Sequence, residues 1–381
     1  MNFPRTTHLL SVSAALLLAI VGCEEEEDTS NDEKPVLNTT LLELGDDCLV
    51  AAYIAISGGR AYVTCEGTWG ADEGRLVVID LEDLSILAST HLGGMAGPVV
   101  INDQHVVVAD GLEGRVFITD LDGEPLHDST DPVVLCPSDP DAGSFQFIRG
   151  LSAIGGGELL ASCFGTSEVI RFEYAAGVES GEVVHARING RATVGHGPGA
   201  SAAWAQDRAI VIDELAGTAS LLELGADMSA DVGRWMLGEA PVRLAIEEQH
   251  MYVTNSLSHT LQLLDLERDP ESATVQEVFI GDGTNPMDLA VRPDGSVLVT
   301  LLMTNQLAIV DPSLGVVTSK MNLPAGSDLL PFEGMTPLAR PHCLAITDDE
   351  RVLVTLNNLD EEWQPAGPGL IAILDLDEES L

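Results

Sequence analysis

The sequence has few basic residues and lacks the short motifs that identify common enzyme classes. Lysine and arginine number 17 against 61 aspartates and glutamates, and the only lysines are Lys34 and Lys320. Such a chain repels nucleic acid and anionic headgroups, so we expect no polyanionic partner. It contains no Gly-x-Ser-x-Gly, His-Glu-x-x-His, Gly-x-x-x-x-Gly-Lys-Ser/Thr or Cys-x-x-Cys-His motif. Hydrolase, zinc-protease, nucleotide-binding and cytochrome functions therefore lose their simplest support.

Beyond its first residues the chain also lacks an apolar run of the ~20 residues that a membrane span needs. Met1–His8 carries one basic side chain, Arg5, and the apolar run Leu9–Val21 follows and ends at Gly22-Cys23. This pattern predicts a signal peptide over residues 1–22. Ile20-Val21-Gly22-Cys23 resembles the bacterial lipobox, which implies that Cys23 is the lipid attachment site. An ordinary signal peptide with an incidental cysteine is the alternative.

The segment after the lipobox is acidic and contains nothing that could be buried. Glu24 to Lys34 includes no aromatic or aliphatic residue, so residues 23–34 are predicted to form a disordered tether. The expected location is the cell envelope, with the protein lipid-anchored to a bacterial membrane, on the periplasmic or surface side of an outer membrane. The rest of the chain, residues 35–381, has the composition of a globular domain.

Internal repetition decides the fold. The clearest copy contains the strands Pro241–Ile246, His250–Asn255 and Leu261–Leu266. Aligning the repeats on the residue equivalent to Asn255 gives seven repeat anchors, which are Cys65, Asp110, Cys163, Asp213, Asn255, Leu301 and Leu356. A third strand ending in Asp recurs at Asp80, Asp120, Asp311 and Asp375. Seven units of about four short strands predict an all-β, seven-bladed β-propeller.

Several repeats carry a known motif. Tyr252-Val253-Thr254-Asn255 spells the YVTN repeat, Tyr62-Val63-Thr64 gives three of its letters, and Pro293-Asp294-Gly295 before Val299-Thr300 matches its preceding turn. The chain resembles a YVTN-repeat family β-propeller lipoprotein over residues 48–381. Ala161-Ser162-Cys163 and Val211-Ile212-Asp213 depart from the motif. The resemblance implies a fold and an extracytoplasmic location and supplies no catalytic residues.

The ends of the chain predict how the ring closes. The last repeat ends at Asp375-Leu376, so its blade lacks an outer strand. Val36–Leu44 alternates in polarity before the first repeat and is the natural donor of that strand. We therefore predict that an N-terminal strand completes the last blade.

Long connections are predicted to gather on one side of the ring, which we call the loop-rich face. Its elaborated loops are Cys65–Gly74, Asp128–Phe147, Leu323–Pro341 and Asn357–Gly369, whereas turns on the opposite face are short. Long loops on a rigid scaffold carry function, so this face is the candidate binding face. Trp69 and Trp363 lie in these loops and favour binding. Drift in tolerant surface loops is the alternative reading.

Five cysteines remain after Cys23. Cys48 and Cys65 hold the same two loop positions in one repeat that Cys136 and Cys163 hold in another, so two local disulfides are predicted. The fifth, Cys343, is expected to be a small buried residue.

Polar side chains are expected at the mouth of the central channel. The repeat register places Tyr53, Arg243, Asp288 and His342 there, with His196 in a preceding loop. Arg, Asp and His around one opening could perform acid–base chemistry, as in propeller lactonases. Propeller channels are also wet, so polar residues there need no catalytic role. Asp120–Glu124 begins like a calcium loop but lacks the downstream Glu, which favours a plain turn.

Two functions follow from this reading. The first is an envelope binding or scaffolding module that recognises a protein or glycan through the loop-rich face. The second is a propeller enzyme, a lactonase-like hydrolase or isomerase, that uses His342, Arg243 and Asp288. No cofactor or metal site is expected beyond weak binding of Ca²⁺ or another divalent cation by surface carboxylates.

Overall fold

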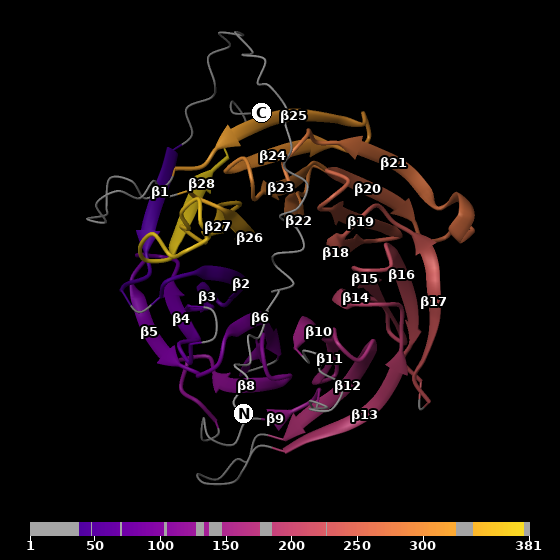
Figure 1. Cartoon of the computed structure of the whole chain (residues 1–381), viewed down its shortest axis with the longest axis horizontal. Coiled ribbons are helices and arrows are strands. Elements are labelled where there is room, and N and C mark those ends of the chain that lie inside the picture. Colours follow the sequence, from indigo (N-terminus) through magenta and orange to yellow (C-terminus); the bar gives the residue numbers. More distant parts are fainter. Residues whose placement is uncertain are drawn as a thin grey trace, which may run out of the picture. The chain divides into compact units, whose positions relative to one another are not determined.

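The structure is a computed structural model. It describes residues 38–376 except for 47, 69–70, 103–104, 127–132, 137–146, 176–184, 226 and 325–337. Seven antiparallel sheets of four strands form a ring (Figure 1). The predicted all-β, seven-bladed propeller is confirmed. The predicted signal peptide, Cys23 and the acidic tether lie outside the described residues.

The first four blades follow the chain in order, from the innermost strand outward. Blade 1 consists of β2 (Ala51–Ser57), β3 (Arg60–Cys65), β4 (Arg75–Asp80) and β5 (Ile86–His91). Blade 2 consists of β6 (Ala96–Asn102), β7 (His105–Asp110), β8 (Arg115–Asp120) and β9 (Val133–Val134). Blade 3 consists of β10 (Ile148–Gly155), β11 (Glu158–Cys163), β12 (Glu168–Ala175) and β13 (His185–Thr193). Blade 4 consists of β14 (Pro198–Ala205), β15 (Arg208–Asp213), β16 (Thr218–Glu223) and β17 (Ser229–Met236).

The remaining three blades complete the ring. Blade 5 consists of β18 (Pro241–Glu247), β19 (His250–Asn255), β20 (Thr260–Asp265) and β21 (Thr274–Phe279), with a short 3-10 helix, η2 (Pro270–Ser272), before β21. Blade 6 consists of β22 (Pro286–Val291), β23 (Val297–Leu301), β24 (Gln306–Asp311) and β25 (Val316–Asn322). Blade 7 consists of β26 (Pro341–Ile346), β27 (Val352–Leu356), β28 (Leu370–Asp375) and β1 (Asn38–Glu43).

Each repeat anchor predicted from the sequence ends the second strand of its blade. These strands are buried almost throughout because both of their faces pack against neighbouring blades, which explains their nearly continuous apolar sequence. The aspartate that ends the third strand has a local role. Asp80 accepts a hydrogen bond from the backbone N–H of Glu82 at 2.8 Å, and Asp265 and Asp311 cap their turns in the same way.

An N-terminal strand closes the ring, as predicted. β1 pairs antiparallel with β28, with Asn38 opposite Asp375 and Glu43 opposite Leu370. The predicted donor, residues 36–44, brackets this strand. Joining the start of the chain to its end in one sheet removes an open edge between the first and last blades.

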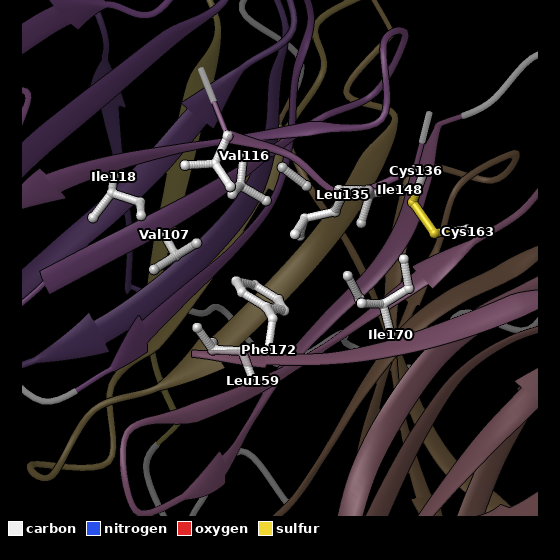
Figure 2. Packing of buried hydrophobic residues seen from close by; sticks show 13 residues of the cluster. Val107, Val116, Ile118, Leu135, Cys136, Ile148, Leu159, Cys163, Ile170 and Phe172 are labelled. Atoms are coloured by element: carbon white, nitrogen blue, oxygen red, sulfur yellow. A yellow bond between two sulfur atoms is a disulfide. The ribbon is translucent and has the colours of Figure 1, made fainter. Parts of the chain in front are cut away.

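Apolar side chains from adjacent blades interlock between the sheets. Figure 2 shows the cluster between blades 2 and 3, where Phe172 lies beside Leu159 and the Cys136–Cys163 disulfide lies in the same cluster. Residues 128–147 were predicted from the sequence to form one loop. The structure corrects this, because Val133 and Val134 of that stretch form β9, the outer strand of blade 2.

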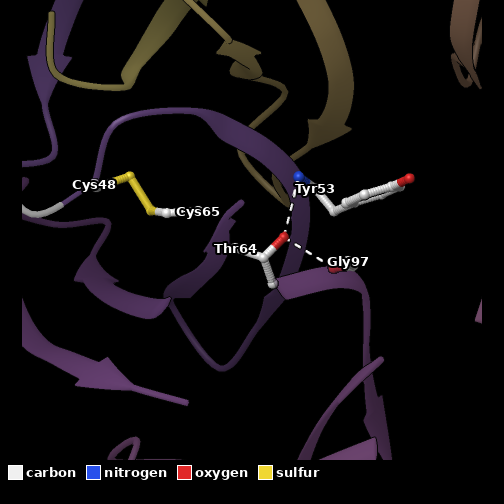
Figure 3. Close-up of a disulfide and its surroundings, with 5 residues drawn as sticks. All are labelled: Cys48, Tyr53, Thr64, Cys65 and Gly97. Carbon is white, nitrogen blue, oxygen red and sulfur yellow. Dashed lines mark hydrogen bonds between the residues drawn. A yellow bond between two sulfur atoms is a disulfide. The ribbon is translucent and has the colours of Figure 1, made fainter. Parts of the chain in front are cut away.

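The threonine of the YVTN-like motif joins successive blades. In blade 1 the Thr64 hydroxyl donates to the Gly97 carbonyl of blade 2 at 2.9 Å and lies 3.3 Å from the Tyr53 backbone N–H (Figure 3). Thr254 and Thr300 donate in the same way to the next blade, at 3.2 and 2.9 Å. Thr355 closes the series by donating to the Ala52 carbonyl of blade 1 at 2.6 Å.

Candidate functional site

A β-bulge at the same place in every innermost strand shapes the channel mouth on the loop-rich face. In each blade the register with the second strand shifts just after the innermost strand begins. The shifts fall at Ala51/Ile54, Ala96/Val99, Ile148/Gly150, Pro198/Ser201, Pro241/Arg243, Pro286/Leu289 and Pro341/Leu344. A bulge re-aims the side chains around it. Seven bulges therefore present one set of side chains to a common centre.

A small cavity lies among the side chains that meet at the mouth. It measures about 10 Å³ and is lined by Tyr53, Arg149, Val242, Arg243, Met287, His342 and Cys343. This volume is about what one water molecule needs. We call the side chains that line this cavity, together with Asp288, the polar plug.

Arg243 is the hub of this plug. Its Nε lies 3.5 Å from the Asp288 carboxylate, its Nη2 donates to the Cys343 sulfur at 3.2 Å, and its guanidinium lies 4.9 Å from the centre of the Tyr53 ring. Asp288 also accepts a hydrogen bond from the Leu344 backbone N–H at 2.9 Å. The polar groups thus satisfy one another across blades 1, 5, 6 and 7.

His342 is held as a neutral ring. Its Nδ1 lies 3.0 Å from the Ala52 carbonyl, and its ring meets the Tyr53 ring edge-on at 5.0 Å. Burial and the positive charges of Arg243 and Arg149 lower the pKa of His342 to about 3. The structure therefore brings His342, Arg243 and Asp288 to one place, with His342 uncharged at neutral pH and hydrogen-bonded to the backbone.

Two charged residues at the mouth were not singled out from the sequence. Arg149 is the second residue of β10 and reaches the Glu214 carboxylate of blade 4, with Nε at 2.9 Å. Glu66 follows β3, and burial raises its pKa to about 7, against the opposing charge of Arg149. Aligning the repeats on their anchors would have found Arg149, which holds in blade 3 the position that His342 holds in blade 7. The raised pKa of Glu66 depends on burial that no local pattern reveals.

The cysteine predictions are confirmed. Cys48 is bonded to Cys65 and Cys136 to Cys163, each pair stapling segments of the loop-rich face (Figures 2 and 3). Cys343 is free and buried. Burial and the negative charge of Asp288 raise the pKa of the Cys343 thiol, so the thiolate that reacts is suppressed.

Trp363 and His196 do not line the cavity at the channel mouth. Trp69 lies outside the described residues. Trp363 lies in the loop after β27, where the Arg340 guanidinium is 4.2 Å from its ring centre, so the ring is partly covered. His196 is exposed before β14, and its Nδ1 lies 3.4 Å from the Ser167 hydroxyl.

Four exposed apolar side chains lie on the loop-rich side of blades 4 and 5. Leu215 and Leu257 hold equivalent positions in the turns after β15 and β19 and are 57% and 42% exposed. Met236 and Phe279 end the outer strands β17 and β21 and are 68% and 57% exposed. We call these four residues the apolar rim. Large apolar side chains exposed on one face are candidates for an interaction surface.

Metal and membrane features were also searched in the described part of the chain. No group of three or more His, Cys, Asp or Glu side chains there could hold a metal ion. Asp120 accepts hydrogen bonds from the backbone N–H groups of Asp122 and Glu124, both at 2.9 Å, so Asp120–Glu124 is a turn. No helix among the described residues is long and apolar enough to cross a membrane.

Comparison with known proteins identifies the fold alone. No family model and no curated protein sequence matches the chain. A virginiamycin B lyase from Staphylococcus aureus has a TM-score of 0.64 at 11% identity, covering 90% of this chain and 100% of that one. The WD40 propeller domain of Doa1 has a TM-score of 0.62 at 10% identity, covering 90% and 97%. A putative 6-phosphogluconolactonase from Bacteroides fragilis has a TM-score of 0.56 at 16% identity, covering 72% and 84%.

Proposed function

We propose that this protein is a lipid-anchored binding module of the bacterial cell envelope, and that it captures a protein partner through its loop-rich face. The apolar rim is the observation that carries the proposal. Leu215 and Leu257 repeat one turn position in adjacent blades, and Met236 and Phe279 extend the same side to the outer strands. The cores of protein–protein interfaces are depleted of charged residues and enriched in Phe and Met, so these exposed side chains suit a protein partner.

The charge near the rim indicates the kind of partner. Glu239 and Asp282 are exposed in the loops that follow Met236 and Phe279. The whole chain carries a net charge of −44. A partner that combines an apolar contact surface with basic side chains would be attracted over a distance and then packed at the rim.

The channel mouth favours binding over catalysis. A substrate would have to displace the Arg243–Asp288 pair and the Arg243–Cys343 contact, because the cavity has room for about one water molecule. His342, with a pKa of about 3, is a weak base at neutral pH. Lyases and putative lactonases share the propeller fold at identities that carry no activity across to this chain.

The test compares three forms of the protein in affinity capture from envelope extract. Wild type is compared with Leu215→Asp/Leu257→Asp and with Leu314→Asp, which changes a leucine that is 72% exposed in the turn after β24, on the opposite face. We expect a protein captured by wild type and by Leu314→Asp to be lost from the double variant. Capture that is equal in all three forms refutes binding at the rim.

The anchor is tested separately, and it rests on the lipobox-like sequence ending at Cys23. Cys23→Ala should remove the diacylglycerol seen by mass spectrometry and release the protein from the membrane fraction. A wild-type protein without diacylglycerol contradicts the anchor.

A further inference from the structure

The direction of β1 determines the side of the ring at which the N-terminal segment joins. β28 begins at Leu370, directly after the Asn357–Gly369 loop of the loop-rich face, and ends at Asp375 on the opposite face. β1 runs antiparallel to it, with Asn38 opposite Asp375. Asn38 therefore lies on the opposite face, and the segment that carries the predicted lipid joins the propeller there.

The opposite face is bordered by exposed carboxylates. Glu247 and Glu248 occupy the turn between β18 and β19, and Asp348 and Asp349 the turn between β26 and β27. An anionic bilayer repels these groups and the net negative charge of the whole propeller. Repulsion holds the body at the far end of its tether. Exposed acids also lie on the loop-rich face, at Glu239, Asp282 and Glu361, so the bilayer repels both faces and the point of attachment is what turns the opposite face toward the bilayer.

We propose that the anchored propeller points its loop-rich face away from the bilayer. The apolar rim then meets a protein from the aqueous phase rather than the lipid of the anchoring membrane. This orientation rests on the lipid anchor of the proposed function. A strand of six residues, such as β28, spans about 20 Å at ~3.3 Å per residue, so labels on the two faces of one blade lie at clearly different heights.

Energy transfer from the protein to the membrane tests the orientation. The mature lipidated protein is reconstituted in vesicles of phosphatidylethanolamine and phosphatidylglycerol that contain an acceptor lipid. A donor dye is attached to Asp348→Cys or to Glu361→Cys, which are matched because both replace an exposed acid of blade 7, one on each face. The protein without an added cysteine is the labelling control, since Cys343 is buried and the other cysteines of the described residues are bonded.

We expect a higher transfer efficiency from Asp348→Cys than from Glu361→Cys at low ionic strength. The difference should shrink in 1 M salt, where the screening length falls to about 3 Å. If the protein floats with the vesicles but the two transfer efficiencies are equal, or the efficiency from Glu361→Cys is higher, the orientation alone is overturned. Protein that carries no diacylglycerol and does not float with the vesicles overturns the anchor instead.

Discussion

Replacing Glu66 by Gln should stabilise the protein above neutral pH and leave it unchanged in acid. Glu66 follows β3 at the channel mouth, where burial raises its pKa from an ordinary 4.5 to about 7. The folded state therefore holds this proton more tightly than the unfolded state. As pH rises from about 4.5 to 7, wild type loses the stability that the bound proton contributes. Gln stays neutral at every pH and avoids this loss.

The size of the effect follows from the two pKa values. Each unit between 4.5 and about 7 corresponds to about 1.4 kcal/mol, which gives an upper limit of about 3 kcal/mol at pH 8. The side chain keeps some contact with solvent, and Gln loses the attraction of Arg149, so we expect a gain of about 1–2 kcal/mol.

Urea unfolding at pH 4.5 and pH 8 measures the difference directly. Glu239→Gln, which alters an exposed acid in a loop of the same face, is the matched control and should change stability little at either pH. A gain for Glu66→Gln that is equal at both pH values would indicate a packing effect. No gain at pH 8 would refute the buried, proton-binding carboxyl.

Three other predictions test the hydrogen bonds between blades, a disulfide and the surface charge. Thr355→Val should lower the free energy of unfolding, measured in urea, by about 2–3 kcal/mol, because the Ala52 carbonyl loses a donor and the Cys343 N–H loses an acceptor. Thr355→Ser keeps the hydroxyl and should recover most of that stability. A Val variant as stable as wild type contradicts the role of the hydroxyl. Replacing Cys48 and Cys65 together by Ser should cost about 3 kcal/mol, the usual value for a loop of this length, and an unchanged melting midpoint would contradict it. The melting midpoint should rise with NaCl, because the excess of carboxylates repels itself in the compact ring. A midpoint that stays flat up to 1 M refutes that repulsion.

Repetition made most of the fold predictable from the sequence. The seven anchors recur because every second strand lies between two blades and must be apolar on both faces, so periodicity and burial give the same register. The closure of the ring by an N-terminal strand was predictable for a related reason, since the last repeat of the sequence lacks its fourth strand. The short β9 was missed because Val133-Val134 is a two-residue strand inside a long connection, too short to show an alternation.

The channel mouth was only partly predictable. Register alone located Arg243, Asp288 and His342 near one opening, since equivalent positions in a ring face the same axis. It could not show that Arg243 is also bound to Cys343, or that the remaining cavity is about 10 Å³. Those properties depend on how seven bulges pack side chains together, and each contact joins residues far apart in the chain. Leu215 and Leu257 stand two residues after the anchors Asp213 and Asn255, so the repeat alignment could have paired them, but it could not show that their side chains are exposed.

The strong negative charge of the chain opposes self-association through the apolar rim. Two copies that met through Leu215 and Leu257 would bring together two bodies of like charge, and at ~0.15 M salt the repulsion acts over about 8 Å, the range of a close encounter. Self-association is therefore opposed at the distance where apolar contact would begin. A basic partner is attracted over the same range. Under the proposed capture of a basic protein at the rim, neutralising Glu239 and Asp282 should therefore weaken that capture more at low salt than at high salt.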